Sequence, residues 1–422
     1  MELKPGCRPT AAGLIPEDWH VSSLQDACRT AITYGIVQCG PHIRNGIPYI
    51  RVSDMDGPEL DVKQMLRTAP TIAARFSRST VQEGDLVYAL RGKLGEVRRV
   101  RGDVAGANLT QGTARIAPKG WIAGDYLLWA LRSPRLVKQA EIDAKGTTFR
   151  EITLADLRRL SVPVPPTNAE QYAIAEALND VDELLGGLDR LIAKKRDLKQ
   201  AAMQQLLTGQ TRLSGFSGEW EDTSLGELGQ FFKGSGVTKE QAHSGSIPCI
   251  RYGELYTHNN DVIRSFYSWI SADVASTATR LQQGDILFAC SGETKEEIGK
   301  CAAFIGEVEA YAGGDIVILR TADTDAVFLG YLLNSAVINR QKASRGQGDA
   351  VVHISSSALS SIRCRMPTAP EQFAIAEVLS DMDAEIAALE RRREKTRALK
   401  QAMMQELLIG KTRLLAPEAA HG

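Results

Sequence analysis

The sequence of 422 residues predicts an α+β protein. Two mixed α/β lobes are expected, separated by a pair of long antiparallel coiled-coil helices, with an internal pseudo-two-fold repeat. Three observations lead to this fold class. A long helical segment occurs twice, at an offset of 201 residues. Apolar residues in both copies recur every three or four positions. The intervening segments combine short apolar runs, turn signals and short amphipathic helices, without the βαβ alternation of a nucleotide-binding fold.

The two helical segments cover residues 170–213 and 371–414, and 25 of their 44 aligned positions are identical. Prolines ahead of each start, and Gly209 and Gly410 at the ends, bound a helix of about 36 residues, or about 54 Å. The predicted seam is Ile174, Leu178, Val181, Leu185, Leu188, Ile192, Ile375, Leu379, Met382, Ile386 and Leu389. A stripe this narrow needs a partner, so we expect the second helix to pack antiparallel against the first.

The repeat also divides the chain into parts. The predicted parts are a loose N-terminal tail at 1–13, a first lobe at 14–165, a first spacer helix at 166–213, a second lobe at 214–366, a second spacer helix at 367–415 and a C-terminal tail at 416–422. Both lobes open alike, with Trp19 matching Trp220 as core anchors. Each continues with an Ile-Pro-x-Ile-Arg strand and a second strand entered through a Gly-Asp turn. The loops that follow differ between the lobes.

Composition restricts the class of protein. No apolar run approaches the length of a membrane span, and the N-terminus has no apolar signal core. Seven scattered cysteines without a CxxC pair favour reduced thiols in the cytoplasm and argue against a zinc site. The net charge of −1 hides an asymmetry. Residues 1–165 carry 23 basic against 17 acidic residues, a net of +6, whereas residues 214–366 carry 13 against 18, a net of −5. Phosphate binding therefore fits the first lobe more easily.

Catalytic patterns are weak. Asp285, Glu293 and Lys295 have the loose D…E-x-K spacing of metal-dependent nucleases, but the matching part of the first lobe lacks the set. Lys411 lies in a Gly-Lys-Thr triplet that resembles the end of a phosphate loop, yet it follows a helix C-terminus, where cations are favoured. No methyltransferase tetrapeptide, glycine-rich cofactor loop or paired metal-binding histidines occur. We therefore expect no enzyme activity, no cofactor and no metal.

Two motifs carry a family resemblance. The EQ-x-A-I-A-E start and the L-K-Q-A-x-M-Q-x-L-L-x-G-x-T-R-L finish of the helices, present twice around variable lobes, resemble the specificity subunit of type I restriction-modification systems. The resemblance implies a non-catalytic subunit whose lobes each read one half of a bipartite, asymmetric target in double-stranded DNA. It also implies that the helices set the spacer and dock two methyltransferase subunits, which in turn carry restriction subunits. The alternative is a two-lobed coiled-coil scaffold for protein partners, which the acidic second lobe favours.

The divergent loops are the expected reading surfaces, because sequence is read by polar side chains that reach base edges. The predicted DNA-contacting residues are Arg51, Arg91, Lys93, Arg98, Thr147 and Arg150 in the first lobe, and Arg251, Ser291, Lys295, Arg345 and Gln347 in the second. For each of them the simpler alternative is a solvated or phosphate-contacting side chain.

Overall fold

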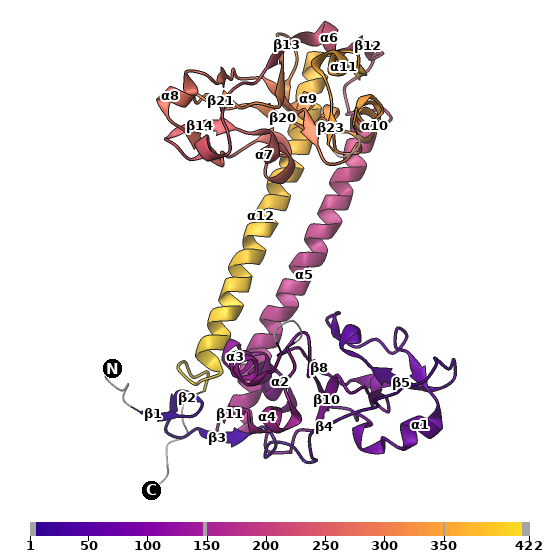
Figure 1. Cartoon of the computed structure of the whole chain (residues 1–422), viewed down its shortest axis with the longest axis vertical. Helices are drawn as coiled ribbons and strands as arrows, with labels where there is room; N and C mark the ends of the chain where they lie inside the picture. The colour runs from indigo at the N-terminus through magenta and orange to yellow at the C-terminus, as the bar shows by residue number, and fades with distance from the viewer. Residues whose placement is uncertain (1–5, 147–149, 349–350, 416–422) are drawn as a thin grey trace. The chain divides into compact units, whose positions relative to one another are not determined.

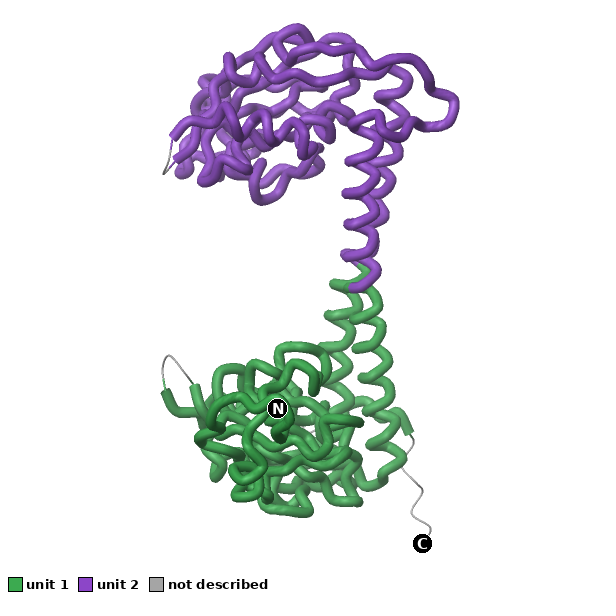
Figure 2. The backbone as a smooth tube through the Cα atoms, turned by 90° about the vertical axis from the view of Figure 1, so that its right-hand side faces the viewer, with its two compact units in different colours: residues 1–189, 392–422 green, residues 190–391 purple. Residues whose placement is uncertain are grey.

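The computed structural model describes residues 6–146, 150–348 and 351–415 (Figure 1). The chain forms two compact units (Figure 2). Unit 1 comprises residues 1–189 and 392–422, and unit 2 comprises residues 190–391. Each unit therefore contains one lobe together with parts of both long helices. The predicted fold class is confirmed: both lobes mix strands and short helices, and two long helices accompany them.

The long helices are α5 (Asn168–Leu206) and α12 (Ala369–Leu407), each of 39 residues. Both end as predicted, at glycines that adopt positive φ: Gly209 at 71° and Gly410 at 70°. A left-handed residue after the last turn is the common way to stop a helix, and glycine adopts it without a Cβ clash. No helix in the described part of the chain is long and apolar enough to cross a membrane.

Ion pairs within each unit join α5 to α12 in antiparallel order: Asp182–Lys400 and Asp189–Arg393 in unit 1, and Arg196–Glu390 and Lys199–Asp383 in unit 2. In unit 1 the Lys400 ammonium lies 2.5 Å from Asp182. In unit 2 the Lys199 ammonium lies 2.6 Å from Asp383. Lys400 and Asp383 follow Lys199 and Asp182 by 201 residues, so the same contact occurs once in each unit.

The predicted seam residues divide into two groups. Ile174 and Leu178 belong to the core of the unit 1 lobe, and Ile375 and Leu379 to the core of the unit 2 lobe. The next positions along the helices are Leu185, Leu188, Ile192 and Ile386, which are buried, and Val181, Met382 and Leu389, which are half-buried. The first positions of each stripe thus anchor a helix to its own lobe, a use that the periodicity alone did not distinguish from helix pairing.

The central strand of each lobe is buried on both faces. In unit 1, Leu86 and Tyr88 of β7 (Leu86–Ala89) face the core shared with the helices, and Val87 and Ala89 face a second core. In unit 2, β18 (Ile286–Ala289) divides its residues between two cores in the same alternating way. Because successive side chains of a strand point to opposite faces, a wholly apolar strand fits only between two layers.

The unit 1 lobe contains two main sheets. The four-stranded sheet runs β4 (Thr33–Tyr34), β10 (Thr113–Ile116), β7 and β8 (Val97–Arg99). The three-stranded sheet runs β6 (Arg67–Thr68), β5 (Ile47–Ile50) and β9 (Asn108–Leu109), with β5 parallel to β9. The helices of this lobe are α1 (Pro70–Ala74), α2 (Gly124–Arg132), α3 (Pro134–Asp143) and α4 (Leu154–Arg159). Trp129 and Tyr126 of α2 fill the core beside α5.

The unit 2 lobe repeats this plan, and each of its two main sheets has one strand more than its counterpart in unit 1. The five-stranded sheet runs β13 (Gly229–Lys233), β22 (Ile316–Thr321), β18, β20 (Cys301–Phe304) and β15 (Asp261–Ile263). The four-stranded sheet runs β16 (Ser268–Ile270), β14 (Ile247–Ile250), β21 (Tyr311–Ala312) and β17 (Thr279–Arg280). The helices are α6 (Leu225–Leu228), α7 (Tyr252–Thr257), α8 (Ala272–Ala275), α9 (Ala326–Leu333), α10 (Ala336–Arg345) and α11 (Ser356–Ser360).

Four two-stranded sheets complete the lobes. They pair β1 (Cys7–Thr10) with β2 (Gly13–Pro16), β3 (His20–Ser23) with β11 (Ser161–Val164), β12 (Glu221–Ser224) with β24 (Arg363–Met366), and β19 (Ser291–Gly292) with β23 (Val352–His353). The β3–β11 and β12–β24 pairs join a strand near the start of each lobe to the last strand of that lobe. Each lobe is thereby closed just before its long helix begins.

In each unit, an ion pair joins the end motif of one long helix to the start motif of the other. In unit 1, Arg413 forms an ion pair with the buried Glu170, and its guanidinium lies 5.9 Å from the centre of the Trp19 ring. In unit 2, Arg212 pairs with the buried Glu371 (2.5 Å). The Thr-Arg-Leu finish of one helix thus binds the Glu-Gln start of the other, and we refer to this arrangement as the arginine clamp.

The glutamines of the same motif connect the long helices to the lobes. In unit 1, the Gln171 side-chain oxygen accepts a hydrogen bond from the backbone N–H of Ala123 (2.7 Å), just before α2. In unit 2, Gln372 accepts one from Asp325 (3.0 Å), just before α9. Since the first N–H groups of a helix have no partner within the helix, a donor next to its start is a natural anchoring point.

Candidate nucleic-acid interface

In unit 1 the two basic loops predicted to contact DNA lie side by side. Arg91 and Lys145 each form an antiparallel bridge with Glu151, one on either side of it. The N–H of Gly92 also donates to the carbonyl of Arg150 (3.2 Å). The Arg91, Lys145 and Arg150 side chains are exposed. The predicted contact residue Thr147 falls outside the described residues.

In unit 2 the corresponding loops meet in the same way. Ser291 of β19 pairs with His353 of β23, and Gln347 bridges to the other side of His353. Gln347 and His353 are exposed, whereas Ser291 is buried. The Ser291 Oγ lies 3.0 Å from Nδ1 of His353. The two lobes thus share a backbone scaffold at this point and present different side chains from it.

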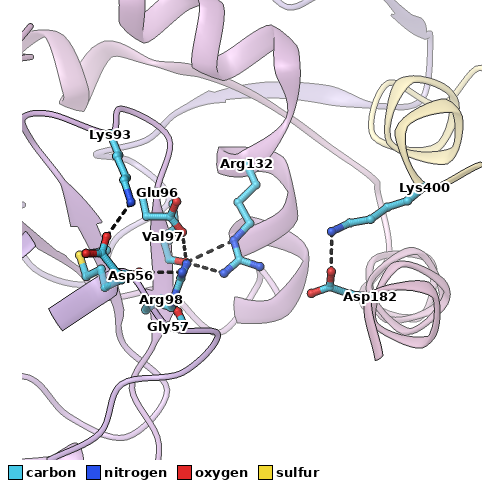
Figure 3. Close-up of polar contacts among 10 residues, drawn as sticks. Asp56, Gly57, Lys93, Glu96, Val97, Arg98, Arg132, Asp182 and Lys400 are labelled. Atoms are coloured by element: carbon cyan, nitrogen blue, oxygen red, sulfur yellow. Dashed lines mark hydrogen bonds and ion pairs between the residues drawn. The ribbon is translucent and has the colours of Figure 1, made fainter. Parts of the chain in front are cut away.

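Arg98 is enclosed by the protein, which argues against the predicted contact with a base. Figure 3 shows its guanidinium enclosed by neighbouring acceptors. It donates to the carbonyl oxygens of Gly57 (2.7 Å) and Met55 (2.7 Å) and forms an ion pair with Glu96. Its side chain is 9% exposed. Arg98 lies in the chain between Val97, which belongs to one core, and Val100, which belongs to the other, so its buried cation must be satisfied by the protein itself.

Lys93 is exposed and lies in the segment that connects β7 to β8. Its ammonium is 2.6 Å from Asp56 (Figure 3), and both side chains of this pair are more than half exposed. The hydrogen bond to Asp56 raises the pKa of Lys93. An exposed pair of this kind contributes little to stability, so Lys93 can exchange Asp56 for a phosphate.

Two further predicted contact residues are occupied within the protein. The Arg51 guanidinium pairs with Asp54 (2.6 Å), and this hydrogen bond raises the pKa of Arg51. The Arg345 guanidinium donates to the carbonyl of Gln341 (2.9 Å) and to Ser361 Oγ (3.0 Å). These arginines contribute positive charge but have fewer free donors. Lys295 is exposed and Arg251 half-buried.

The aspartates of the Gly-Asp turns are structural. Asp85 and Asp285 are fully buried. The Arg115 Nε lies 2.6 Å from Asp85. Both carboxylate oxygens of Asp285 accept from Arg320, each at 2.8 Å. Asp285 is therefore unavailable as the metal ligand of the D…E-x-K pattern. The described residues contain no cluster of three or more potential metal-binding His, Cys, Asp or Glu side chains, and all seven cysteines are free thiols.

The structure adds three residues that sequence reasoning missed. Phe232, Lys233 and His353 line a groove of about 430 Å³ in unit 2 together with Ser291 and Gln347. The signals were present but weak. Phe232 and Lys233 end a short apolar run, GQFFK, and His353 follows a pair of valines. Neither run is long enough to place a strand, and only the fold brings them together.

The family model described as "Type I restriction modification DNA specificity domain" matches residues 16–193 and 217–397. The chain is similar to the type I restriction enzyme MjaVIII specificity subunit of Methanocaldococcus jannaschii, with 23% identity over 95% of this chain and 94% of the relative. It is 28% identical to the EcoBI specificity subunit of Escherichia coli, a match that spans 47% of this chain and 43% of that relative.

Solved structures show the same fold. The crystal structure of the type I restriction-modification S subunit from M. genitalium aligns with a TM-score of 0.58 and 16% identity, covering 96% of this chain and 98% of that one. A chain from a study of complex assembly and conformational transition of the type I R-M system aligns with a TM-score of 0.58 and 17% identity, covering 94% and 99%.

Proposed function

This chain belongs to the family of type I restriction-modification DNA specificity subunits, and on that premise we propose that each lobe reads one half of a bipartite, asymmetric target in double-stranded DNA. Subunits of this class recognise DNA and carry no catalytic activity of their own. In the proposed complex the helices set the spacer and dock two methyltransferase subunits, through which restriction subunits join. The complex acts in the cytoplasm, on duplex DNA.

The observation that carries the proposal is a shared scaffold with divergent side chains. The same three-segment backbone arrangement presents Arg91, Lys145 and Glu151 in unit 1. In unit 2 it presents Gln347 and His353 beside Ser291. Two readers of different sequences need a constant frame and different hydrogen-bonding groups, because each base pair offers its own donor and acceptor pattern in the major groove.

The outer faces of the long helices support partner docking. Tyr172 of α5 and Phe373 of α12 occupy equivalent positions and are 59% and 61% exposed. Leu198 and Leu399 form a second equivalent pair, 47% and 54% exposed. Large apolar side chains that stay exposed at both copies of a repeat are expected where the same kind of partner binds twice. Two methyltransferase subunits, one per copy, fit this pattern.

A lobe exchange tests the division of the target. Residues 214–366 are replaced by the matching segment of a relative with a different target, and the complex is reconstituted with its methyltransferase subunits. Mapping methylated sites should reveal one new half-site, with the other half and the gap unchanged. Exchange of residues 14–165 is the matched control and should change the opposite half. A change in both halves, or in neither, would contradict modular reading.

The protein-scaffold alternative has one observation in its favour, the net charge of −5 on residues 214–366. The two functions differ in their salt dependence. Phosphate contacts release counterions, so binding of the assembled complex to duplex DNA should weaken steeply between 50 and 200 mM salt. If the assembled complex does not bind duplex DNA even at low salt, the scaffold alternative is favoured.

A further inference from the structure

We infer that the groove of unit 2 is the DNA-reading site of the second lobe, and that His353, positioned by Ser291, reads a base edge there. This inference rests on the proposed function and names residues that carry it out. The groove has a volume of about 430 Å³ and lies between β13, β19, β23 and the start of α11. Its principal polar and aromatic side chains are Phe232, Lys233, Ser291, Arg345, Gln347 and His353.

The charge of the groove differs from the charge of its lobe. Residues 214–366 carry a net charge of −5. Among the described residues, however, the groove is lined by two cations, Lys233 and Arg345, and by a single carboxylate residue, Asp315. Phosphate contact needs positive charge at the contact site itself. The groove is therefore a place where an acidic lobe can meet DNA.

His353 is held in a fixed position. Its N–H donates to the carbonyl of Gln347 (2.8 Å), and its own carbonyl accepts from the N–H of Gln347 (2.9 Å). The flanking Val352 and Ile354 are buried. On the ring, Nδ1 lies 3.0 Å from the buried Ser291 Oγ. Backbone, neighbours and ring are all constrained, so little conformational freedom is left for DNA binding to remove.

The other ring nitrogen is available to a ligand. Nε2 of His353 has no hydrogen-bond partner among the described residues, and the residue is exposed. An imidazole nitrogen can donate to or accept from a base edge, depending on the tautomer that the Ser291 contact selects. Gln347, which is exposed beside it, adds an amide of the kind that pairs with adenine. Together they form a compact reading pair.

Phe232 and Lys233 supply the wall of the groove. Phe232 is 37% exposed, and the Arg320 guanidinium lies 4.7 Å from the centre of its ring. Arg320 is in turn fixed by the buried Asp285. This immobile ring offers an apolar contact for a thymine methyl group or a sugar. Lys233, the next residue, is exposed and can contact a phosphate.

The test uses the complete complex with its methyltransferase subunits and a duplex that carries the mapped target. His353→Ala should reduce discrimination at one base pair of the second half-site on the order of tenfold to a hundredfold. Lys233→Ala should weaken binding to all duplexes equally and lower the salt slope by about one. Lys239→Ala, an exposed lysine of the same lobe outside the groove, is the matched control and should leave both quantities unchanged.

Ser291 is a positioning residue, so its variant needs a separate readout. Ser291→Ala should relax the same base pair as His353→Ala. The double variant should be no worse than His353→Ala alone, because both changes remove one interaction. A purely structural role of Ser291 would instead lower the melting temperature and leave the base preference intact, which would overturn its assignment.

Failure of this inference differs from failure of the proposed function. If exchange of residues 214–366 changes the second half-site while the His353 and Lys233 variants keep the parental base preference and affinity, the groove is not the reading site. If those variants no longer assemble with the methyltransferase subunits but still recognise the parental half-sites, the groove binds protein. The inference is then also overturned. If the exchange itself changes nothing, the proposed function fails.

Discussion

Removing Arg413 should destabilise unit 1 far more than removing a neighbouring lysine. The Arg413 guanidinium pairs with Glu170 and, at 3.0 Å, with Asp18. Glu170 is 2% exposed, so Arg413→Ala leaves an uncompensated carboxylate in the core of unit 1. Lys411, two residues earlier, forms only a surface pair with Glu406, in which the side chains are 51% and 42% exposed. Lys411→Ala is therefore the matched control.

The expected magnitudes follow from burial. Breaking a buried ion pair by removing one partner costs about 3–5 kcal/mol. Because the Arg413 side chain is 20% exposed, we expect the lower end, about 3 kcal/mol. An exposed pair contributes about 0–1 kcal/mol, which sets the expectation for Lys411→Ala. Glu170→Gln added to Arg413→Ala should recover part of the loss, since it removes the unpaired charge.

Hydrogen exchange locates the effect, and urea denaturation gives its size. In Arg413→Ala, amides at the start of α5 and at the end of α12 should exchange faster, whereas those around Glu371 should keep the parental rate. Arg212→Ala, the equivalent change in unit 2, should show the opposite pattern. Equal losses for Arg413→Ala and Lys411→Ala, or faster exchange at both clamps in Arg413→Ala, would refute the assignment of the arginine clamp.

Three further predictions concern the helices and the second lobe. Four residues inserted beside Asp189 lengthen α5 by about 6 Å and slightly more than one turn. The gap between the half-sites should therefore grow by one or two base pairs of about 3.4 Å each. A gap that stays unchanged in methylation maps would show that α5 does not set it. Leu185→Glu with Ile386→Glu buries two unpaired carboxylates and should abolish assembly with methyltransferase subunits in size-exclusion chromatography, whereas a stable complex would show that this seam is not required. Burial lowers the pKa of Lys342 on α10, so between this lowered pKa and about pH 10.4 the unfolded chain binds more protons than the folded one, and stability is lost as the pH falls through this window. Lys342→Met should raise the melting temperature at pH 7, with a gain that shrinks as the pH approaches 10; a gain independent of pH would contradict this cause.

The long helices were predictable because their signals are local and occur twice. The heptad-like stripe, the preceding prolines and the closing glycines each act within a few residues, and Gly209 and Gly410 end their helices in the expected way. Trp19 and Trp220 were also predicted as core anchors, and both are buried. A periodic pattern shows that a face is buried without showing what covers it. Ile174 and Ile375 therefore gave no sign that they contact the lobes.

The details of the candidate site depend on contacts between distant segments. Arg98 looked like an exposed member of a basic loop, yet its acceptors Met55 and Gly57 lie about forty positions earlier. The pairing of Ser291 with His353 joins segments 62 residues apart. Neither contact leaves a trace in the surrounding sequence, because hydrogen-bond satisfaction of a buried group depends on the fold and not on its neighbours along the chain.

Unit 1 combines residues from both ends of the chain, and this decides which lobe is complete first during synthesis. Its core contains Met404, Leu407 and Leu408 beside Trp19, so the first lobe is completed by residues near the C-terminus. Unit 2 is one continuous stretch, residues 190–391. During synthesis, which proceeds from the N-terminus, the second lobe has all its parts before the first one does. A ribosome that stops after residue 391 would release a chain whose later-made lobe is whole and whose earlier-made lobe still exposes part of its core.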